Sequence, residues 1–471
     1  MRSRILKDHL KEECGVFGIM SAEARVSTLT YYGLFALQHR GQESAGIAVS
    51  DGREIFLHKA MGLVGEVFDD ATLKRLGGEI ACGHVRYSTS GDSNVINAQP
   101  LVFKTRYGTI ALCHNGNLAN SIFLRNDLKE HGAIFQTTVD TEVIAAMLAR
   151  GNGEDLVTTI REVSRELKGA YALIIMTSDK LIGIRDPYGI RPLCIGKIGD
   201  DFMLSSESCA FETVGGTLIR DVYPGEIVEI DRSGITSHLP YEKREERLCI
   251  FEFIYFGRPD SIMKDQSLYM SRKTAGKILF REFPASADFV CSVPDSGTPS
   301  AIGFSEASGI PFLEGLVKNR YVGRTFIKPS QNQREIGVAL KLNVLEEVVR
   351  GRSIVLVDDS IVRGTTVKRL ISRLRVAGAK EIHLRISAPP VVWPCYFGID
   401  TPSREELLGA RYSTDEIGKL VDADSIGYLS LEGLVEATGR SGFCTGCLSG
   451  EYPVDVDEIN GKLALEGRAM R

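Results

Sequence analysis

Residues 354–366 read Ile-Val-Leu-Val-Asp-Asp-Ser-Ile-Val-Arg-Gly-Thr-Thr, and this stretch decides the fold of the second half of the chain. Its apolar run predicts a strand buried on both faces, as strands of parallel sheets are. A helical pattern, Thr365–Ala377, follows and stops at Gly378, a residue typical of helix C-termini. Strand, loop and helix in this order predict an open parallel sheet with helices on both sides.

The loop between that strand and helix carries groups that suit a sugar phosphate. Two adjacent carboxylates at the strand end can accept hydrogen bonds from vicinal hydroxyls and help to hold Mg²⁺. Gly364 allows a left-handed backbone, and the start of a helix favours a phosphate through its free N–H groups. An Asp pair alone is as often a helix cap, so the prediction depends on the whole stretch. The candidate residues are Asp358, Asp359, Ser360, Ile361, Val362, Arg363, Gly364, Thr365 and Thr366.

Two further segments are predicted to face the same site. Val293–Gly297 follows a predicted strand, and its Ser296 is a candidate Mg²⁺ ligand beside the two aspartates. The stretch Lys318–Lys341 has six basic residues and one acid, and its Lys318 and Arg320 are candidate phosphate ligands. Such a loop can close over a polyphosphate and exclude water. A solvated surface loop is the alternative.

The pattern of elements changes along the chain. Before residue 231, short strand-like runs dominate, which suggests packed sheets. After residue 267, strands and helices alternate, as in Asp288–Val293, Thr298–Ser308, Phe312–Val317 and Glu381–Ser387. The charged stretch Arg232–Arg247 is the expected domain junction, with a solvated loop inside one domain as the alternative.

The composition excludes several classes of protein. Of the 471 residues, 43% are hydrophobic and 25% are charged, which is ordinary globular composition. A net charge of −5 without a long basic run argues against a nucleic-acid or membrane partner. The apolar runs are far shorter than the ~20 residues of a membrane span. Met1–Glu13 lacks the apolar middle of a secretory signal, so we expect a cytoplasmic protein.

The front of the chain has a cysteine, Cys14, at the start of the first predicted strand. A cysteine there is usually a core residue. Several polar segments beside strand sequence argue for chemistry instead: Leu37–Glu43, Gly83–Thr89, His114–Asn117 and Thr138–Glu142.

These motifs resemble two known families. The stretch 354–366 closely resembles the phosphoribosyl pyrophosphate (PRPP) signature of type I phosphoribosyltransferases. The front segments, in their order, resemble the N-terminal-nucleophile glutaminase domain of class II glutamine amidotransferases. Together they make residues 14–455 similar to the glutamine-dependent amidophosphoribosyltransferase family.

The resemblance implies both a fold and a division into domains. It implies an α+β, four-layer αββα glutaminase domain, followed by an α/β phosphoribosyltransferase domain with a central parallel sheet. The expected segments are a propeptide (1–13), the glutaminase domain (14–240), the phosphoribosyltransferase domain with cluster-binding elements (241–455) and a tail (456–471).

The resemblance also implies roles for single residues. In the family the catalytic cysteine is residue one, and its α-amine is the base. A thiol of pKa near 8.5 reacts best beside a base of pKa ~7.7–8.0. A cut between Glu13 and Cys14 is therefore implied. The family pattern assigns the oxyanion donors to Asn115 and Gly116, and glutamine binding to Arg40, Gly41, Arg86 and Asp140.

Ten cysteines are present, and disulfides are not expected in a cytosolic chain. The pair Cys444 and Cys447, with Cys249 and Cys395, could hold a metal, and thiolates suit zinc and iron–sulfur clusters equally. Free thiols are the third possibility. The branch of the family that has a propeptide also has a 4Fe–4S cluster, so the resemblance implies that cluster, one per subunit.

The implied activity joins glutamine hydrolysis at Cys14 to ammonia transfer onto Mg²⁺-bound PRPP. Glu252–Ser261 lies between the two halves and suits either interdomain core or the wall of an ammonia channel, with Tyr255 as the lining residue. Purine-nucleotide inhibitors and a homotetramer are implied as well. The alternatives are an amidotransferase for another acceptor, which would lack stretch 354–366, and a non-enzymatic sensor, which would have lost Cys14 or Arg86.

Overall fold

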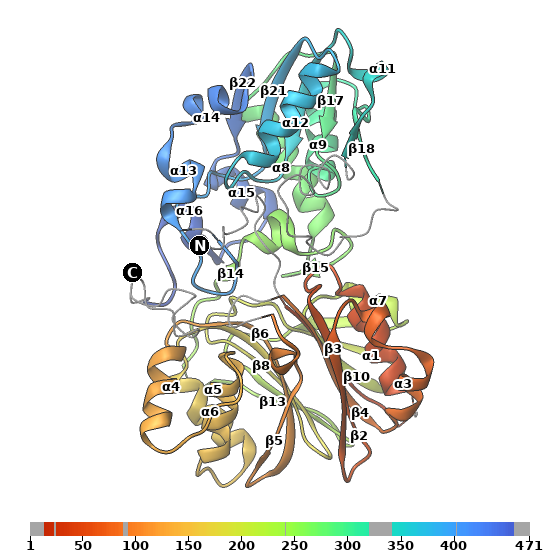
Figure 1. Cartoon of the computed structure of the whole chain (residues 1–471), viewed down its shortest axis with the longest axis vertical. Coiled ribbons are helices and arrows are strands. Elements are labelled where there is room, and N and C mark those ends of the chain that lie inside the picture. The colour runs from red at the N-terminus through yellow and green to blue at the C-terminus, as the bar shows by residue number, and fades with distance from the viewer. Residues whose placement is uncertain are drawn as a thin grey trace.

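The computed structural model describes residues 14–22, 25–87, 93–240, 242–319, 342–401 and 403–455. The predicted propeptide, the tail, Arg320 and nearly all of the basic stretch fall outside these residues. The chain forms two lobes, one from each half of the sequence, stacked along the long axis of the molecule (Figure 1).

The first lobe begins with a seven-stranded sheet in the order β11-β9-β10-β1-β4-β2-β3. Helix α1 (Val26–Ala36) packs on its outer face through Leu34, against Phe17 of β1. The strands are β1 (Gly15–Met20), β2 (Ser44–Ser50), β3 (Ile55–Met61), β4 (Ile80–Arg86), β9 (Cys194–Ile198), β10 (Asp201–Ser205) and β11 (Thr217–Asp221). Three short helices, α2 (Val64–Val67), α3 (Asp70–Arg75) and α7 (Cys209–Thr213), accompany α1.

A second sheet of six strands, in the order β13-β12-β8-β7-β6-β5, faces the first. Its outer face is covered by α4 (Ser121–Glu130), α5 (Thr141–Arg150) and α6 (Leu156–Glu166). The strands are β5 (Leu101–Thr105), β6 (Gly108–Leu118), β7 (Gly169–Met176), β8 (Leu181–Arg185), β12 (Ile227–Asp231) and β13 (Gly234–His238), with the 3-10 turn η1 (Val95–Asn97) before β5.

Apolar side chains fill the space between the two sheets. Val16 and Cys82 of the first sheet pack against Cys113 and Ile174 of the second. Helix, sheet, sheet and helix therefore form four layers, which confirms the predicted αββα fold. Strand β13 occupies part of the charged stretch expected as a junction, so the chain leaves this lobe only after His238.

The second lobe contains a four-stranded parallel sheet, β17-β20-β21-β22. Val355 and Val357 of β20 face α8, α9 and α15, whereas Ile354 and Leu356 face α12 and α14. This alternation confirms a doubly covered parallel sheet. The bounds are β17 (Phe289–Ser292), β20 (Ser353–Asp358), β21 (Glu381–Ile386), β22 (Ser425–Tyr428), α8 (Leu268–Glu282), α9 (Thr298–Ser308), α12 (Thr365–Val376), α14 (Thr414–Val421) and α15 (Leu431–Thr438).

One predicted strand, Phe312–Val317, is wrong in its extent. Phe312 makes only a single bridge to Val290, and the strand β18 covers Leu316–Lys318. The run is interrupted because the N–H of Gly315 turns back to the carbonyl of Leu313 at 3.1 Å. β18 then pairs with β19 (Leu342–Val344) outside the main sheet.

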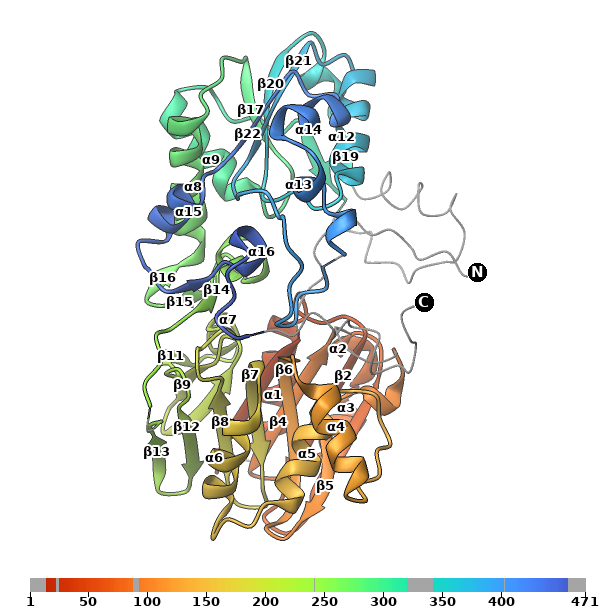
Figure 2. The same cartoon turned by 90° about the vertical axis from the view of Figure 1, so that its left-hand side faces the viewer.

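Short elements join the lobes (Figure 2). Strands β14 (Leu248–Cys249) and β23 (Phe443–Cys444) pair in parallel, and a π-helical turn, η2 (Glu252–Phe256), follows β14. The remaining elements are β15 (Ile262–Met263), β16 (Gln266–Ser267), α11 (Glu346–Val349), η3 (Arg404–Glu406), α13 (Leu408–Arg411) and α16 (Gly446–Ser449). Within the described ranges, the helices are all too short or too polar to span a bilayer.

Candidate active sites

Cys14 lies immediately before β1 and is held against the neighbouring strand β4. Its side chain is buried, and its thiol donates a hydrogen bond of 3.4 Å to the carbonyl of Tyr87. Burial raises the pKa of the thiol to about 11, although this hydrogen bond and the charge of Arg86 act in the opposite direction. The thiol is therefore protonated at neutral pH, and a base is needed to make it a nucleophile.

A small cavity adjoins this thiol. It brings together residues from β4, β6 and the start of α5: Cys14, Arg86, Tyr87, Gln99, His114, Gly116, Val139 and Asp140. Four residues predicted from the sequence, far apart along the chain, thus meet at one place. An arginine and an aspartate in one cavity can bind opposite ends of an amino acid.

Asn115, the residue before Gly116, is 1% exposed. Neither polar atom of its side-chain amide has a hydrogen-bond partner within the described part of the chain. A buried, unpaired polar group costs about 1–3 kcal/mol, so its presence calls for an explanation, and a catalytic role is one. Gly116 has a φ of +147°, and a Cβ atom there would lie 2.0 Å from the carbonyl oxygen of Ala170. Only glycine fits this position.

Asp140 is ionised at the end of the cavity. Burial alone would raise its pKa, but the charge of His114 and hydrogen bonds, among them one of 3.0 Å from the N–H of Leu118, lower the pKa below its ordinary value. His84, on the neighbouring strand β4, is buried, and burial lowers its pKa to about 3, so its ring is neutral.

Gln99 and His114 are parts of the cavity that sequence reasoning did not assign. The side chain of Gln99 accepts a hydrogen bond of 2.7 Å from the N–H of His114 and donates one of 3.0 Å to Thr141. It thereby ties β6 to the start of α5. No local pattern around Gln99 indicates this role.

Arg40 does not line the cavity, although the sequence predicts it as a glutamine-binding residue. Its guanidinium binds Glu207 at 2.6 Å and Glu252 at 2.7 Å, and its Nε donates to the carbonyl of Cys14 at 3.2 Å. Arg40 therefore supports Cys14 through the backbone, outside the cavity lining. Gly41 does not line the cavity either; a Cβ atom there would lie 2.5 Å from the backbone of Val85, so Gly41 permits close packing on β4.

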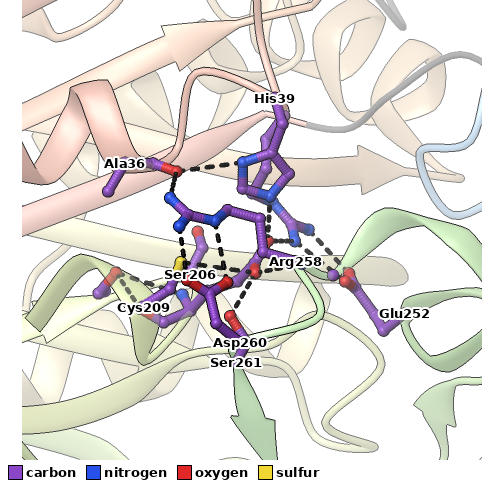
Figure 3. Close-up of polar contacts among 12 residues, drawn as sticks. Ala36, His39, Ser206, Cys209, Glu252, Arg258, Asp260 and Ser261 are labelled. Carbon is purple, nitrogen blue, oxygen red and sulfur yellow. Dashed lines mark hydrogen bonds and ion pairs between the residues drawn. The ribbon is translucent and has the colours of Figure 1, made fainter. Parts of the chain in front are cut away.

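Glu207 is a buried carboxylate between the lobes that sequence reasoning missed. From the first lobe it binds His39 at 2.7 Å, and from the second it accepts hydrogen bonds from Ser261 Oγ at 2.7 Å and Arg258 N–H at 2.9 Å. Figure 3 labels these three partners, His39, Ser261 and Arg258. Burial alone would raise the pKa of Glu207, but His39 and Arg40 hold it well below its ordinary value. This network joins the lobes directly behind Cys14.

The predicted phosphate loop lies at the carboxyl end of β20. Asp358 and Asp359 are 4% and 3% exposed, and Gly364 adopts a left-handed φ of +74° at the start of α12. Ser296 Oγ donates to Asp359, as does Ser360 Oγ at 2.6 Å. The structure thus brings the segment Val293–Gly297 to the aspartates.

Two cations predicted at this loop have different surroundings. Lys318 pairs with Asp295, beside the aspartates. Arg363 instead turns to Glu406 of η3, at 2.8 Å. Arg320 lies outside the described residues.

A divalent cation fits this loop only in part. In the described part of the chain, no three His, Cys, Asp or Glu residues are grouped closely enough to enclose a metal ion. Mg²⁺ commonly takes one or two carboxylates and leaves its other positions to water and substrate phosphates. Asp358, Asp359 and the hydroxyl of Ser296 suit that incomplete coordination.

The four cysteines set apart by the sequence converge near the junction of the lobes. Cys249 of β14 lies opposite Cys444 of β23 in the parallel pair, and Cys447 lies one turn later, in α16. Burial raises the pKa of these three thiols, and Cys395 raises each further by its proximity. Within the described residues, however, these thiols are not grouped closely enough to enclose a metal ion.

A second small cavity lies behind the phosphate loop. Its lining includes Phe253 and Ile254 of η2, Arg272 of α8 and Ser387. Arg272 donates to the carbonyls of Phe253 and Gly257, each at 2.7 Å, and so fixes η2 against this cavity. Tyr255 is half-buried and packs on Phe256 outside the cavity lining.

Comparison with known protein families gives one match in each lobe. Residues 84–213 match the model of a glutamine amidotransferase domain, and residues 261–389 match that of a phosphoribosyl transferase domain.

The chain is also similar to known proteins over nearly its full length. The chain is 50% identical to an amidophosphoribosyltransferase of Synechocystis sp., with 98% of this chain and 95% of that one covered. It is 50% identical to that of Methanocaldococcus jannaschii, with 94% and 98% covered. A solved structure of glutamine PRPP amidotransferase from B. subtilis, complexed with ADP and GMP, superimposes with a TM-score of 0.90 at 46% identity, covering 94% of this chain and 98% of that one.

Proposed function

The chain belongs to the amidophosphoribosyltransferase family, and from that membership we propose how its residues divide the reaction between two sites. The enzyme forms 5-phosphoribosylamine, glutamate and pyrophosphate from glutamine, PRPP and water in purine biosynthesis. The observation that carries the proposed division is the convergence of Cys14, Arg86, Gly116 and Asp140 on one cavity of the first lobe. The aspartate loop lies in the other lobe.

The first site hydrolyses glutamine. Cys14 attacks the side-chain amide and releases ammonia as a thioester forms, and water then frees glutamate. A buried thiol whose pKa is raised to about 11 needs a nearby base. The α-amine of Cys14 is that base once residues 1–13 have been removed, because an internal peptide nitrogen cannot accept the proton.

Asn115 and Gly116 stabilise the tetrahedral oxyanion. Among the described residues the amide of Asn115 has no hydrogen-bond partner, and this supports the role because such a donor is available when charge develops. Arg86 binds the α-carboxylate of glutamine and the ionised Asp140 binds its α-ammonium. Arg40 acts on this site through the carbonyl of Cys14, with Gly41 packed beside it.

The second site binds PRPP in the loop Asp358–Thr366. Asp358 and Asp359 accept the ribose hydroxyls, and the start of α12, after Gly364, binds the 5′-phosphate. Ser296 with the two aspartates would hold Mg²⁺, which would neutralise the charge of the leaving pyrophosphate. Lys318 and Arg320 bind the pyrophosphate from the basic loop.

Ammonia passes between the sites within the protein. The cavity behind the phosphate loop, walled by η2 and Arg272, supports a path through the junction. Tyr255, on η2, lines this path when the substrates are bound. Exclusion of water protects PRPP from hydrolysis.

Cys249, Cys395, Cys444 and Cys447 would hold a 4Fe–4S cluster that ties the C-terminal segment to the lobe junction. The proximity of the partly buried Cys395 to the three buried cysteines supports this assignment. A cytoplasmic homotetramer inhibited by purine nucleotides completes the proposal; the ADP and GMP in the B. subtilis relative support the nucleotide sites.

The decisive experiment compares the parent enzyme with Cys14→Ala. Both glutamine- and ammonia-dependent formation of phosphoribosylamine are measured. The proposal requires that Cys14→Ala loses the first activity and keeps the second. Loss of both in a folded protein would contradict separate sites.

A further inference from the structure

A loop of the second lobe contacts the strand end that carries the proposed oxyanion donors. Residues 395–398 extend from the upper lobe down to β6 (Figure 2). Asn117, two residues after Asn115, donates a hydrogen bond of 2.8 Å from Nδ2 to the carbonyl of Tyr396. The link joins positions 279 residues apart in the sequence.

A second contact lies beside the first. Arg191, fully buried, donates from Nε to the carbonyl of Phe397 at 2.8 Å, and Nη2 donates to the same oxygen. The backbone of Arg191 is in turn fixed to the carboxylate of Asp186 at 3.0 Å. Side chains of the first lobe therefore donate hydrogen bonds to two consecutive carbonyls of the loop, those of Tyr396 and Phe397.

The loop also packs directly on Gly116. Gly398 has a φ of +114°, and a Cβ atom on it would lie 3.3 Å from the carbonyl carbon of Gly116 and 3.0 Å from Arg191 Nη2. The backbones of Gly398 and Gly116 therefore approach each other closely beside the guanidinium of Arg191. A shift of the loop therefore moves the strand end that presents Gly116.

Building on the function proposed above, we propose that the loop Cys395–Gly398 positions the oxyanion strand, with Asn117 and Arg191 as its positioning residues. An oxyanion donor acts only when it lies about 2.7–3.1 Å from the developing charge. A misplacement of about 1 Å can cost about 10²-fold in rate. The second lobe thus sets the alignment of the glutaminase through backbone contacts, at a distance from PRPP.

The test compares Asn117→Ala with the matched control Asn120→Ala. Asn120 makes the same kind of bond, from Nδ2 to the carbonyl of Glu166 at 2.9 Å, but within the first lobe. We expect Asn117→Ala to lower kcat for glutamine hydrolysis about 10- to 100-fold. The KM for glutamine should change less than about twofold, because Arg86 and Asp140 are untouched. Asn120→Ala should match the parent.

Ammonia-dependent activity and iron content report on the rest of the molecule. Both should equal those of the parent in Asn117→Ala, and the second variant, Arg191→Lys, should lower the same kcat. A normal kcat in both variants, or an equal loss of both activities in Asn117→Ala, would overturn the proposal. A parent enzyme without glutamine-dependent activity would refute the proposed function instead, so the two failures are distinguishable.

Discussion

Nε of Arg40 donates a hydrogen bond of 3.2 Å to the carbonyl oxygen of Cys14. The same guanidinium is held by Glu207 from the first lobe and by Glu252 from the second, and all three side chains are buried. The position of the nucleophile therefore depends on a charge network that exists only when the lobes are joined.

Glu252→Gln should weaken this network. Removal of one partner of a buried ion pair typically costs about 3–5 kcal/mol, because the remaining charge stays desolvated. We expect a lower melting temperature and a lower kcat with glutamine. Glu436→Gln, which removes the exposed pair of Glu436 with Arg281, is the control and should leave both quantities unchanged. Equal melting temperatures for the two variants would contradict the network's role.

Asn115→Ala should lower kcat with glutamine by about 10²–10³-fold, the usual effect of losing one oxyanion donor. Its melting temperature should not fall, because the amide of Asn115 has no partner to lose within the described residues. Asn97→Ala is a contrasting variant, since the buried Asn97 bonds Thr138 at 2.9 Å and should lose stability. Calorimetry and steady-state kinetics measure both effects. An Asn115→Ala protein with full activity would remove that residue from the mechanism.

His84 should make the folded state acid-sensitive. Its pKa is about 3 when folded and 6.5 in the unfolded chain, so between these values the unfolded chain binds the extra proton. Stability is therefore lost as pH falls from 6.5 toward 3, by about 1.4 kcal/mol per pH unit, and is unaffected above 6.5. In His84→Gln the fall in melting temperature from pH 6.5 to pH 4 should be shallower. An unchanged slope would refute this account.

Asp359→Asn should weaken PRPP binding. Loss of hydrogen bonds to a charged group costs about 1.5–3 kcal/mol, which corresponds to about 10- to 150-fold in Kd. Titration calorimetry with Mg²⁺ and PRPP measures this change. Asp415→Asn, an exposed change on α14, should bind as the parent does. Glutamine hydrolysis in the absence of PRPP should persist, and its loss would indicate a general folding defect.

Cys444→Ser should abolish iron and sulfide incorporation, because one thiolate ligand is lost. Cys209→Ser, a change at another buried cysteine, should retain the parent's content. Intact mass of the same anaerobic preparations should show a chain that begins at Cys14. Iron retained in Cys444→Ser, or a chain that still begins at Met1, would contradict the corresponding assignment.

The sequence alone determined the elements whose pattern is local. The apolar run before Asp358 predicts β20 because a doubly buried strand must be apolar throughout. Gly309 and Gly378 mark helix ends because glycine adopts the left-handed backbone found there. The extent of Phe312–Val317 was wrong, since a turn at Gly315 overrides its strand propensity.

Only the tertiary structure decided which distant groups meet. Nothing near Glu207, Glu252 or Asn117 in the sequence indicates their partners, because ion pairs and hydrogen bonds across the lobe junction depend on packing and not on spacing along the chain. Arg40 shows the difference most clearly. The sequence predicts Arg40 as a residue that supports the glutamine pocket, but only the fold shows that its guanidinium binds two buried carboxylates and the carbonyl of Cys14.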